Sequence, residues 1–429
     1  MKTPNSNNIA TTTSWFRTAA PYIHAHRGAT FVVAFDGETI ATKGFDSLVH
    51  DFALLNSLGI KLVLVYGARR QTDVQSKIHN VDINYHDGVR ITDNNSLKIA
   101  RSVIGKLRLD IEAKLSFGLP HTPMAHAQVR CTSGNLVTAR PVGIKDGIDF
   151  GHTGEVRRVD TQGINDQLTL GNVVLLPPMG FSPTGEFFNL SYEAIATTVA
   201  KDLAADKLIF IGDNCDDLDR EMTVEQAANT KDSHPTMAAA VDACKAGVKR
   251  VHLLDRDQDG ALLQELFSRD GAGTLITADL FETIRQATIE DVGGILELIQ
   301  PLEANGVLVK RSRDHLEMEV DHFAVMERDG TVVACAALYP YPERKIGELA
   351  CLAVAKDYQD QGRGKKLLSG IEQQSKAAGL SSLCVLTTQT AHWFIEHGFK
   401  EAEIADLPVA KQDFYNYQRN AKVFSKELV

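Results

Sequence analysis

Short apolar runs without polar alternation constrain the fold of this chain more than any other feature. In the first two thirds of the sequence they cover residues 30–35, 61–66, 172–177, 207–211 and 248–254. Stretches with helical spacing, such as 45–58 and 191–203, lie between them. Strands that are buried on both faces read as continuous apolar runs, and such strands belong to parallel sheets. The sequence therefore predicts an α/β fold in which helices cover both faces of a parallel-rich sheet.

The character of the sequence changes near residues 279–286. A short strand at 284–288, an amphipathic helix at 290–302 and a hairpin at 322–338 follow, which indicates a mixed α+β domain. A chain of 429 residues is too long for a single core. We therefore expect three segments, which are a disordered polar tail at 1–14, a larger domain at 15–277 and a smaller domain at 278–429. Residues 212–236 are acidic and polar, and we expect them to form a loop.

Composition excludes several classes of function. The net charge of −10 argues against a nucleic-acid partner, which requires a dense basic surface. No apolar run is long enough to span a membrane, and the polar N-terminal residues lack the features of a signal peptide, so we expect a cytoplasmic protein. The six cysteines show no C-x-x-C spacing, so they indicate neither a zinc site nor a redox motif.

The segment most informative for function is a strand, a loop and a helix between Ile346 and Gln374. The strand at 346–354 is apolar except for Glu348, and the loop after it contains Gly362 and Gly364. Two glycines at this spacing let the backbone approach a ligand, and the following helix offers unpaired N–H groups and the positive end of its dipole. This pattern predicts a pyrophosphate cradle beside a nearly buried carboxylate.

The order of motifs in this part resembles the GNAT-type acetyltransferases, which hold acetyl-CoA on a Q/R-x-x-G-x-G/A loop. The motifs here are Arg285-x-Ala287-Thr288-x-x-Asp291 and Gln359-x-x-Gly362-x-Gly364. A closer resemblance, to the bacterial N-acetylglutamate synthases, rests on residues 301–303, 309–313, 335–338, 347–354, 386–388, 392–399 and 415–419. The resemblance implies that acetyl-CoA is the cosubstrate and that no metal takes part. The implied acetyl-CoA contacts are Leu352, Ala353, Val354, Gln359, Gln361, Gly362, Arg363, Gly364 and Lys365.

The resemblance also implies the reaction, which is acetylation of the α-amino group of L-glutamate, the first step of arginine biosynthesis. The amine attacks the thioester directly, and a base must first remove a proton from the α-ammonium. The resemblance assigns that role to Glu348, whereas a structural ion pair with a lysine or arginine is the alternative. It further implies an oxyanion contact from a backbone N–H near Leu352 or Ala353. Thr387 is the implied proton donor to the leaving thiolate, with an ordinary strand residue as the alternative.

Glutamate carries two carboxylates, which arginine side chains bind well. The basic candidates for this role are Arg311, Arg313, Arg419 and Lys422. The resemblance places Arg311 and Arg419 in the glutamate pocket, whereas a solvated basic face is the alternative. The sequence departs from the family after Arg419, because Asn420-Ala421 stands where the family usually has a serine before the lysine.

Residues 15–277 resemble the amino acid kinase fold, a three-layer αβα domain. The matching segments include 28–33, 55–69, 134–135, 185–190, 196–197 and 203–209. Kinases of this type use a lysine and paired glycines after the first strand to hold phosphates. Ala34 and Asp36 stand at the corresponding positions here, so we expect no kinase activity.

The resemblance implies that this domain senses L-arginine. The implied arginine site consists of Tyr22, Lys207, Glu265, Gly271 and Gly273. The alternative is that both glycines form an ordinary loop and that Glu265 lies on a solvated helix face. The family also suggests a homo-oligomer, specifically a hexamer. Three rival functions stay open, which are acetylation of another amine, phosphotransfer and non-catalytic arginine binding.

Overall fold

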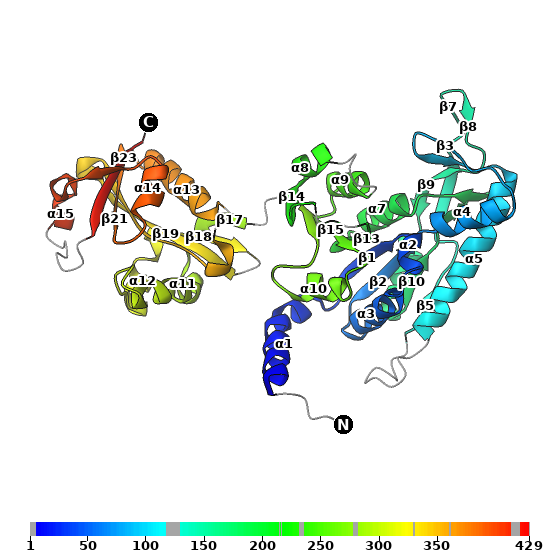
Figure 1. The fold of residues 1–429 in the computed structure, drawn as a ribbon, viewed down its shortest axis with the longest axis horizontal. Coiled ribbons are helices and arrows are strands. Elements are labelled where there is room, and N and C mark those ends of the chain that lie inside the picture. Colours follow the sequence, from blue (N-terminus) through cyan, green and yellow to red (C-terminus); the bar gives the residue numbers. More distant parts are fainter. Residues whose placement is uncertain are drawn as a thin grey trace. The chain divides into compact units, whose positions relative to one another are not determined.

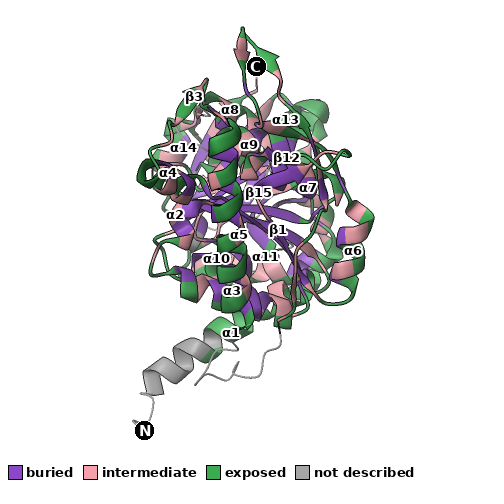
Figure 2. Ribbon diagram, turned by 90° about the vertical axis from the view of Figure 1, so that its right-hand side faces the viewer, coloured by how far each residue is buried: buried purple, intermediate pink, exposed green. Residues whose placement is uncertain are grey.

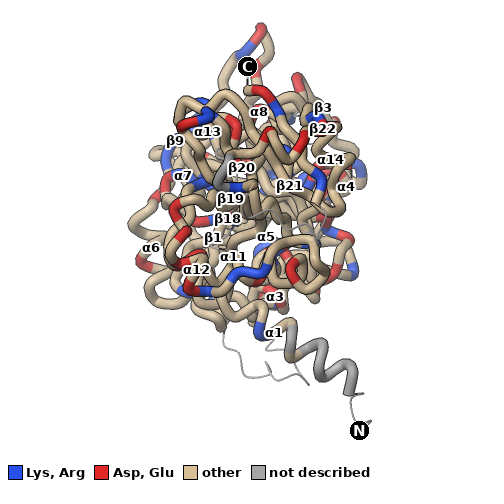
Figure 3. Tube along the Cα trace, turned by 90° about the vertical axis from the view of Figure 1, so that its left-hand side faces the viewer, with Lys and Arg blue, Asp and Glu red and all other residues tan. Residues whose placement is uncertain are grey.

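The computed structural model describes residues 6–116, 129–213, 215, 217–230, 236–277, 282–328, 331–359, 362–412 and 421–428. They belong to two compact units, Met1–Asp279 and Leu280–Val429, which we describe separately (Figure 1). Within the described residues, no helix combines the length and the apolar character that a membrane-spanning segment needs. Figure 3 shows acidic and basic positions interspersed along the chain.

An eight-stranded sheet forms the centre of the first unit, in the order β14-β16-β15-β13-β1-β2-β10-β5. Along the chain its strands are β1 (Thr30–Phe35), β2 (Lys61–Tyr66), β5 (Cys131–Thr132), β10 (Val173–Leu176), β13 (Lys207–Gly212), β14 (Glu221–Thr223), β15 (Arg250–Asp255) and β16 (Thr274–Thr277). All neighbouring strands in this order run parallel except β15 and β16. The predicted parallel-rich sheet is therefore confirmed.

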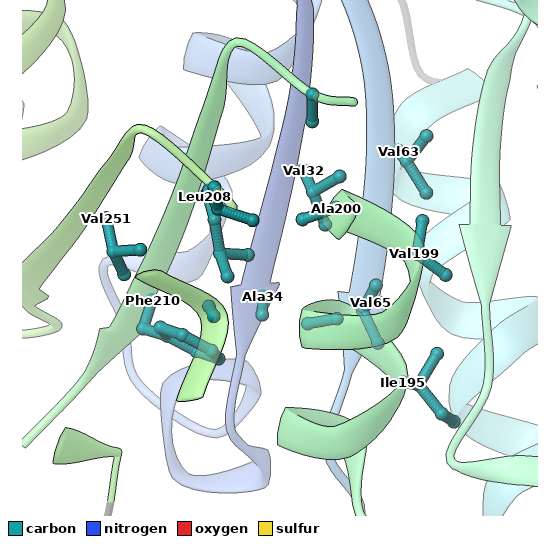
Figure 4. Packing of buried hydrophobic residues seen from close by; sticks show 14 of the residues in the cluster. Val32, Ala34, Val63, Val65, Ile195, Val199, Ala200, Leu208, Phe210 and Val251 are labelled. Atoms are coloured by element: carbon teal, nitrogen blue, oxygen red, sulfur yellow. The ribbon is translucent and has the colours of Figure 1, made fainter. Parts of the chain in front are cut away.

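Helices cover both faces of this sheet because successive strand residues point to opposite sides. One face packs against α1 (Ser6–His26), α3 (Phe45–Ser57), α5 (Asn94–Ser116) and α10 (Ala261–Phe267). The other face packs against α6 (Thr161–Thr169), α7 (Tyr192–Asp202), α8 (Val224–Thr230) and α9 (Met237–Lys245). Figure 4 shows Ile195 and Val199 of α7 above β2, near Val63 and Val65. The central strands β1, β2, β10 and β13 are buried, whereas the outer faces of the helices are exposed (Figure 2).

Smaller elements complete the first unit. Two short helices, α2 (Gly37–Ile40) and α4 (Arg69–Ile78), follow β1 and β2. A second sheet has the order β12-β11-β6-β9, with β6 (Val137–Pro141), β9 (Gly154–Val159), β11 (Met179–Phe181) and β12 (Phe187–Asn189). Two hairpins also occur, β3 (Asn84–His86) with β4 (Val89–Ile91), and β7 (Ile144–Lys145) with β8 (Ile148–Asp149).

Two expectations for the first unit differ from the structure. The helix α1 begins at Ser6, although we expected a disordered tail up to residue 14. Once a helix has formed, adding residues costs much less than nucleating it, so it extends beyond its apolar stripe. The expected loop at 212–236 contains β14 and α8. Their order comes from non-local packing, because β14 pairs with β16 and its Met222 is buried, which no local pattern reveals.

The second unit contains a seven-stranded sheet in the order β17-β18-β19-β20-β21-β23-β22. Its strands are β17 (Glu282–Gln286), β18 (Phe323–Arg328), β19 (Thr331–Tyr341), β20 (Ile346–Val354), β21 (Ser382–Thr387), β22 (Lys400–Ala402) and β23 (Lys422–Glu427). Helices α11 (Val292–Ala304) and α12 (Arg313–Met318) pack on one face, and α13 (Arg363–Ala377) and α14 (Ala391–Glu396) on the other. The short helix α15 (Val409–Gln412) follows near the C-terminus. Neighbouring strands are antiparallel, except that β20 and β21 are parallel.

Candidate active site

The strands β20 and β21 pair along only part of their length. Their parallel ladder runs from Ile346 to Leu349 on β20 and ends there, although β20 continues to Val354 and β21 to Thr387. On the other side of β20, the register with β19 shifts opposite Cys351, whose φ of 50° lies in the left-handed region. A β-bulge of this kind bends a strand and ends its regular pairing. The two strands therefore part in the middle of the sheet, next to Glu348.

The loop after β20 leads into α13 at a glycine. Gly362 is the N-cap residue of this 15-residue helix, with a φ of 74°, and a glycine offers no side chain to cap the first turn. A Cβ atom on Gly364 would lie 3.2 Å from Cζ2 of Trp393, so the backbone is in close contact on that side. The uncapped N–H groups and the helix dipole suit a pyrophosphate.

The remaining candidates around this loop differ in where they lie. The Gln359 amide donates to the carbonyl of Val354 at 3.1 Å and so ties the loop to the end of β20. Arg363 is buried, and its guanidinium stacks over the ring of Tyr358 at 4.8 Å, which directs its charge into the protein. Arg363 therefore contributes its backbone N–H, and not its guanidinium, to the first turn of the helix. Lys365 is exposed, and Gln361 lies outside the described residues.

Glu348 is buried in the centre of the sheet, with 5% of its surface exposed. Its Oε1 lies 2.8 Å from Nζ of Lys411, on α15, and its Oε2 accepts a hydrogen bond from the Tyr341 hydroxyl at 3.4 Å. Burial and the adjacent Glu348 carboxylate raise the pKa of Tyr341, so the phenol keeps its proton. Glu348 thus has both the buried position that suits a base and the lysine partner that the structural alternative requires.

Two buried thiols lie near Glu348. Burial raises the pKa of Cys351 to about 11 and that of Cys384 to about 12. Cys384 is directly opposite Glu348 in the β20–β21 ladder. Because the thiolate is the nucleophilic form, neither thiol is activated at neutral pH.

The side chain of Thr387 is used by the turn that follows β21. Its Oγ1 accepts the backbone N–H of Thr390 at 3.0 Å and lies 2.8 Å from the Thr390 hydroxyl. Thr387 is buried at the end of β21 that no longer pairs with β20. This position suits the implied contact with the leaving group. The hydrogen bonds within the turn are, however, a sufficient structural reason for a threonine here.

The basic candidates for carboxylate binding separate into two groups. The Arg311 guanidinium lies beside Tyr339, which is directly opposite Glu348 in the β19–β20 ladder, so Arg311 reaches the sheet near the carboxylate. In contrast, Arg313 is 68% exposed and pairs with Glu317 on its own helix at 2.8 Å. Lys422 is 63% exposed and lies 3.7 Å from Glu401. Arg419 lies outside the described residues.

Known protein families match parts of both units. Residues 29–255 match the amino acid kinase family, and residues 294–399 match the acetyltransferase (GNAT) family. An amino-acid acetyltransferase from Azotobacter vinelandii is 50% identical over 427 residues, which cover 97% of this chain and 99% of that protein. The chain belongs to the amino-acid acetyltransferase family. The enzyme is an acyltransferase, and the resemblances to the amino acid kinase and GNAT families are confirmed.

Solved structures are also similar to this acetyltransferase over 97% of the chain. N-acetylglutamate synthase from Neisseria gonorrhoeae, complexed with coenzyme A and L-arginine, is 37% identical and has a TM-score of 0.86. The alignment covers 97% of this chain and 99% of that chain. A second structure of that synthase, complexed with coenzyme A and N-acetyl-glutamate, has the same identity and coverage and a TM-score of 0.61.

In the first unit of the acetyltransferase, the candidates for arginine sensing gather in one buried network. Glu265 Oε1 lies 2.5 Å from Nδ1 of His252, and Glu265 Oε2 accepts the backbone N–H groups of Ala272 and Gly273 at 2.6 and 2.9 Å. Burial raises the pKa of Glu265, but these hydrogen bonds outweigh it and lower the pKa to about 2. Gly271 has a φ of 64°, and a Cβ atom there would lie 2.4 Å from the Glu265 carboxylate.

Lys207 and α1 join the same network. Lys207 is buried, with its Nζ 3.4 Å from Nε2 of His252. His26 on α1 lies 2.8 Å from the carbonyl of Leu266, and the ring of Tyr22 is 6.4 Å from that of His26. Glu265 is therefore not on a solvated helix face as the alternative supposed, because its Oε1 contacts His252 and its Oε2 orders the loop at 271–273.

The turn after β1 carries a carboxylate where kinases of this fold hold phosphates. Asp36 Oδ1 accepts the N–H of Thr39 at 2.7 Å and caps α2. Asp36 Oδ2 lies 2.6 Å from Nη1 of Arg256, which also pairs with Asp213. A paired, negatively charged group in this turn disfavours a triphosphate.

Three residues near Glu348 were not anticipated from the sequence. Lys411 and Tyr341 contact Glu348, and Cys351 forms the bulge that parts the strands. No local pattern identifies Lys411, because a single lysine in a four-residue helix has no distinguishing context. Tyr341 could have been noticed, since it ends the strand next to the one that carries Glu348.

Proposed function

We propose that this acetyltransferase transfers the acetyl group of acetyl-CoA to the α-amino group of L-glutamate, in the first step of arginine biosynthesis. The observation that carries the proposal is the parting of β20 and β21 beside a buried Glu348, with the guanidinium of Arg311 close to the same part of the sheet. The full-length similarity to a synthase complexed with coenzyme A and N-acetyl-glutamate supports the choice of substrate.

The loop and the parted strands suit acetyl-CoA in two ways. The first turn of α13, from Gly362 to Lys365, offers N–H groups to the pyrophosphate. The second half of β20, which contains Leu352, Ala353 and Val354, lies beyond the β20–β21 ladder and can line the pantetheine arm and thioester. When bound, acetyl-CoA supplies an activated acetyl group with a good leaving thiolate. A backbone N–H near Leu352 or Ala353 would donate to the developing oxyanion.

Glu348 is the proposed general base. A buried carboxylate at the parting of the strands can accept a proton from the substrate ammonium, directly or through one water. The high pKa values of Cys351 and Cys384 support direct attack by the amine rather than an acyl-cysteine intermediate. Thr387 is the proposed donor to the leaving thiolate, and for this role its hydroxyl would have to turn from Thr390 Oγ1 to the sulfur.

Arg311 is the best supported ligand for a glutamate carboxylate. We retain Arg419 as its proposed partner on the strength of the resemblance. Arg313 and Lys422 are weaker proposals, because each would have to leave a surface carboxylate, Glu317 or Glu401, to reach the substrate.

A CoA-release assay tests the substrate. Purified full-length enzyme with acetyl-CoA and a panel of amino acids should release CoA fastest with L-glutamate, at the highest kcat/KM. A preference for another amino acid or amine would overturn the glutamate assignment, whereas release of ADP from ATP with any of them would favour the kinase alternative.

We also propose that L-arginine regulates the reaction through the buried network of Glu265, His252 and Lys207. The similar synthase complexed with L-arginine supports this assignment. Regulation requires that arginine binds two states of the enzyme with different affinity.

A further inference from the structure

A lysine occupies the place that the mechanism reserves for the substrate. Lys411 Nζ lies 2.8 Å from Oε1 of Glu348, which is within the distance that a base needs to take a proton from an amine. The ε-ammonium of lysine and the α-ammonium of an amino acid are the same chemical group. The contact therefore resembles the one that the substrate itself would make with Glu348.

The two ammonium groups compete for one carboxylate. The side chain of Glu348 is only 6% exposed, and its other oxygen faces the Tyr341 hydroxyl at 3.4 Å. On β21, Cys384 lies directly opposite Glu348 in the ladder. Among the described residues, this packing leaves only 6% of the Glu348 side chain exposed, so a second cation has little room beside the carboxylate while Lys411 stays in place.

Lys411 is the partner that can leave. Its side chain is 32% exposed and has a flexible four-carbon stem, whereas Glu348 is fixed in the middle of the sheet. The short helix α15 does not depend on the lysine either. Gln412 donates to the carbonyls of Leu407 and Ala405 at 2.7 and 3.0 Å, and Arg344 donates to that of Leu407 at 2.9 Å.

We propose that Lys411 is a specificity-determining residue that holds Glu348 in the free enzyme and is displaced by the α-ammonium of the amino acid. The inference rests on the proposed function, because it takes Glu348 as the base. Displacement leaves the buried carboxylate uncompensated unless the ligand brings a positive charge of its own, and an unpaired buried charge is costly. A dicarboxylate without an amino group therefore binds with the Lys411 pair intact, and only an amino acid exchanges it.

The test compares glutamate with glutarate, which has both carboxylates but no amine. In the Lys411→Met variant, at saturating acetyl-CoA, the ratio of the KM for glutamate to the Ki for glutarate should fall by about three- to tenfold, because the competing ammonium is gone. The kcat should change by less than about twofold, since Lys411 has already left in the reacting complex. Lys411→Arg, which keeps the charge, should keep the wild-type ratio. Lys426→Met removes a lysine that pairs with Glu372 at 2.6 Å in the same unit and should change neither quantity.

Each other outcome contradicts the inference. An unchanged ratio, or a loss of kcat without a change in the ratio, would show that Lys411 only supports the fold or the chemistry. If Lys411→Met and Lys411→Gln both fail to fold, the pair is structural. Glu348→Gln separates this failure from that of the proposed function. Normal turnover in Glu348→Gln would overturn the assignment of Glu348 as the base. Lost turnover in Glu348→Gln, together with an unchanged ratio in Lys411→Met, would overturn only the role of Lys411.

Discussion

At the scale of single residues, a conservative substitution separates the proposed role of Glu348 as a base from its role as the ion-pair partner of Lys411. Glu348→Gln keeps the shape and an oxygen for Lys411 but cannot take a proton. We expect kcat to fall by about 10²–10⁴-fold, the usual contribution of a positioned base, with the KM for acetyl-CoA unchanged. Glu372→Gln is the matched control, because Glu372 also pairs with a lysine in this unit, and it should keep full turnover. Equal rates in both variants would leave Glu348 with a structural role only.

At the scale of elements, two glycines at opposite ends of α13 test the pyrophosphate cradle. Gly362 and Gly379 both have a φ of 74°, and a Cβ atom at either would meet no heavy atom within 4 Å. Alanine at each position should therefore cost a similar amount of stability, about 1–2 kcal/mol, because of the left-handed backbone. Only Gly362→Ala changes the backbone where the phosphates would bind, so only it should raise the KM for acetyl-CoA. Equal KM values in the two variants would contradict a cradle at Gly362.

At the scale of the whole molecule, the buried His26 makes the stability of the fold depend on pH. Burial, followed by the charge of Lys207, lowers the pKa of His26 from 6.5 to about 4. The folded state therefore favours the neutral imidazole, and its stabilisation is complete above pH 6.5 and is lost as the pH falls toward 4. The loss amounts to about 3 kcal/mol for one group. Urea unfolding of the wild type should show this decline between about pH 7 and about pH 4, and His26→Gln, which cannot titrate, should show a smaller one.

Regulation also belongs to the whole molecule, because the proposed arginine network and the proposed active site lie in different units. Glu265→Gln removes the charge that orders the backbone at 271–273, so we expect the arginine concentration for half-maximal effect to rise at least about fivefold. CoA release across an arginine titration measures it, with Glu225→Gln on α8 as an exposed control. An unchanged arginine response in Glu265→Gln would contradict the network as the sensor. The expected homo-oligomer, specifically a hexamer, stays a prediction that light scattering of the full chain can test.

Much of the fold could be predicted because its signals are local. The apolar runs at 30–35 and 61–66 became β1 and β2 with the same bounds, and the run at 346–354 became β20. The strand and helix on either side of Gly362 and Gly364 could be located for the same reason, since chain geometry within a few residues determines such a turn. The strand β14 and helix α8 were missed because they owe their order to a distant partner, β16.

The amino-acid sequence by itself determined the architecture of both units, the family and the candidate residues, because periodicity and motif spacing depend on neighbours along the chain. Only the tertiary structure decided which charged groups meet. It paired Glu348 with Lys411, Asp36 with Arg256 and Glu265 with His252, and it left Arg313 beside Glu317 and Lys422 beside Glu401. Contacts between charges act over a few ångströms, so they depend on strand register and helix packing, which bring together residues that lie far apart in the sequence.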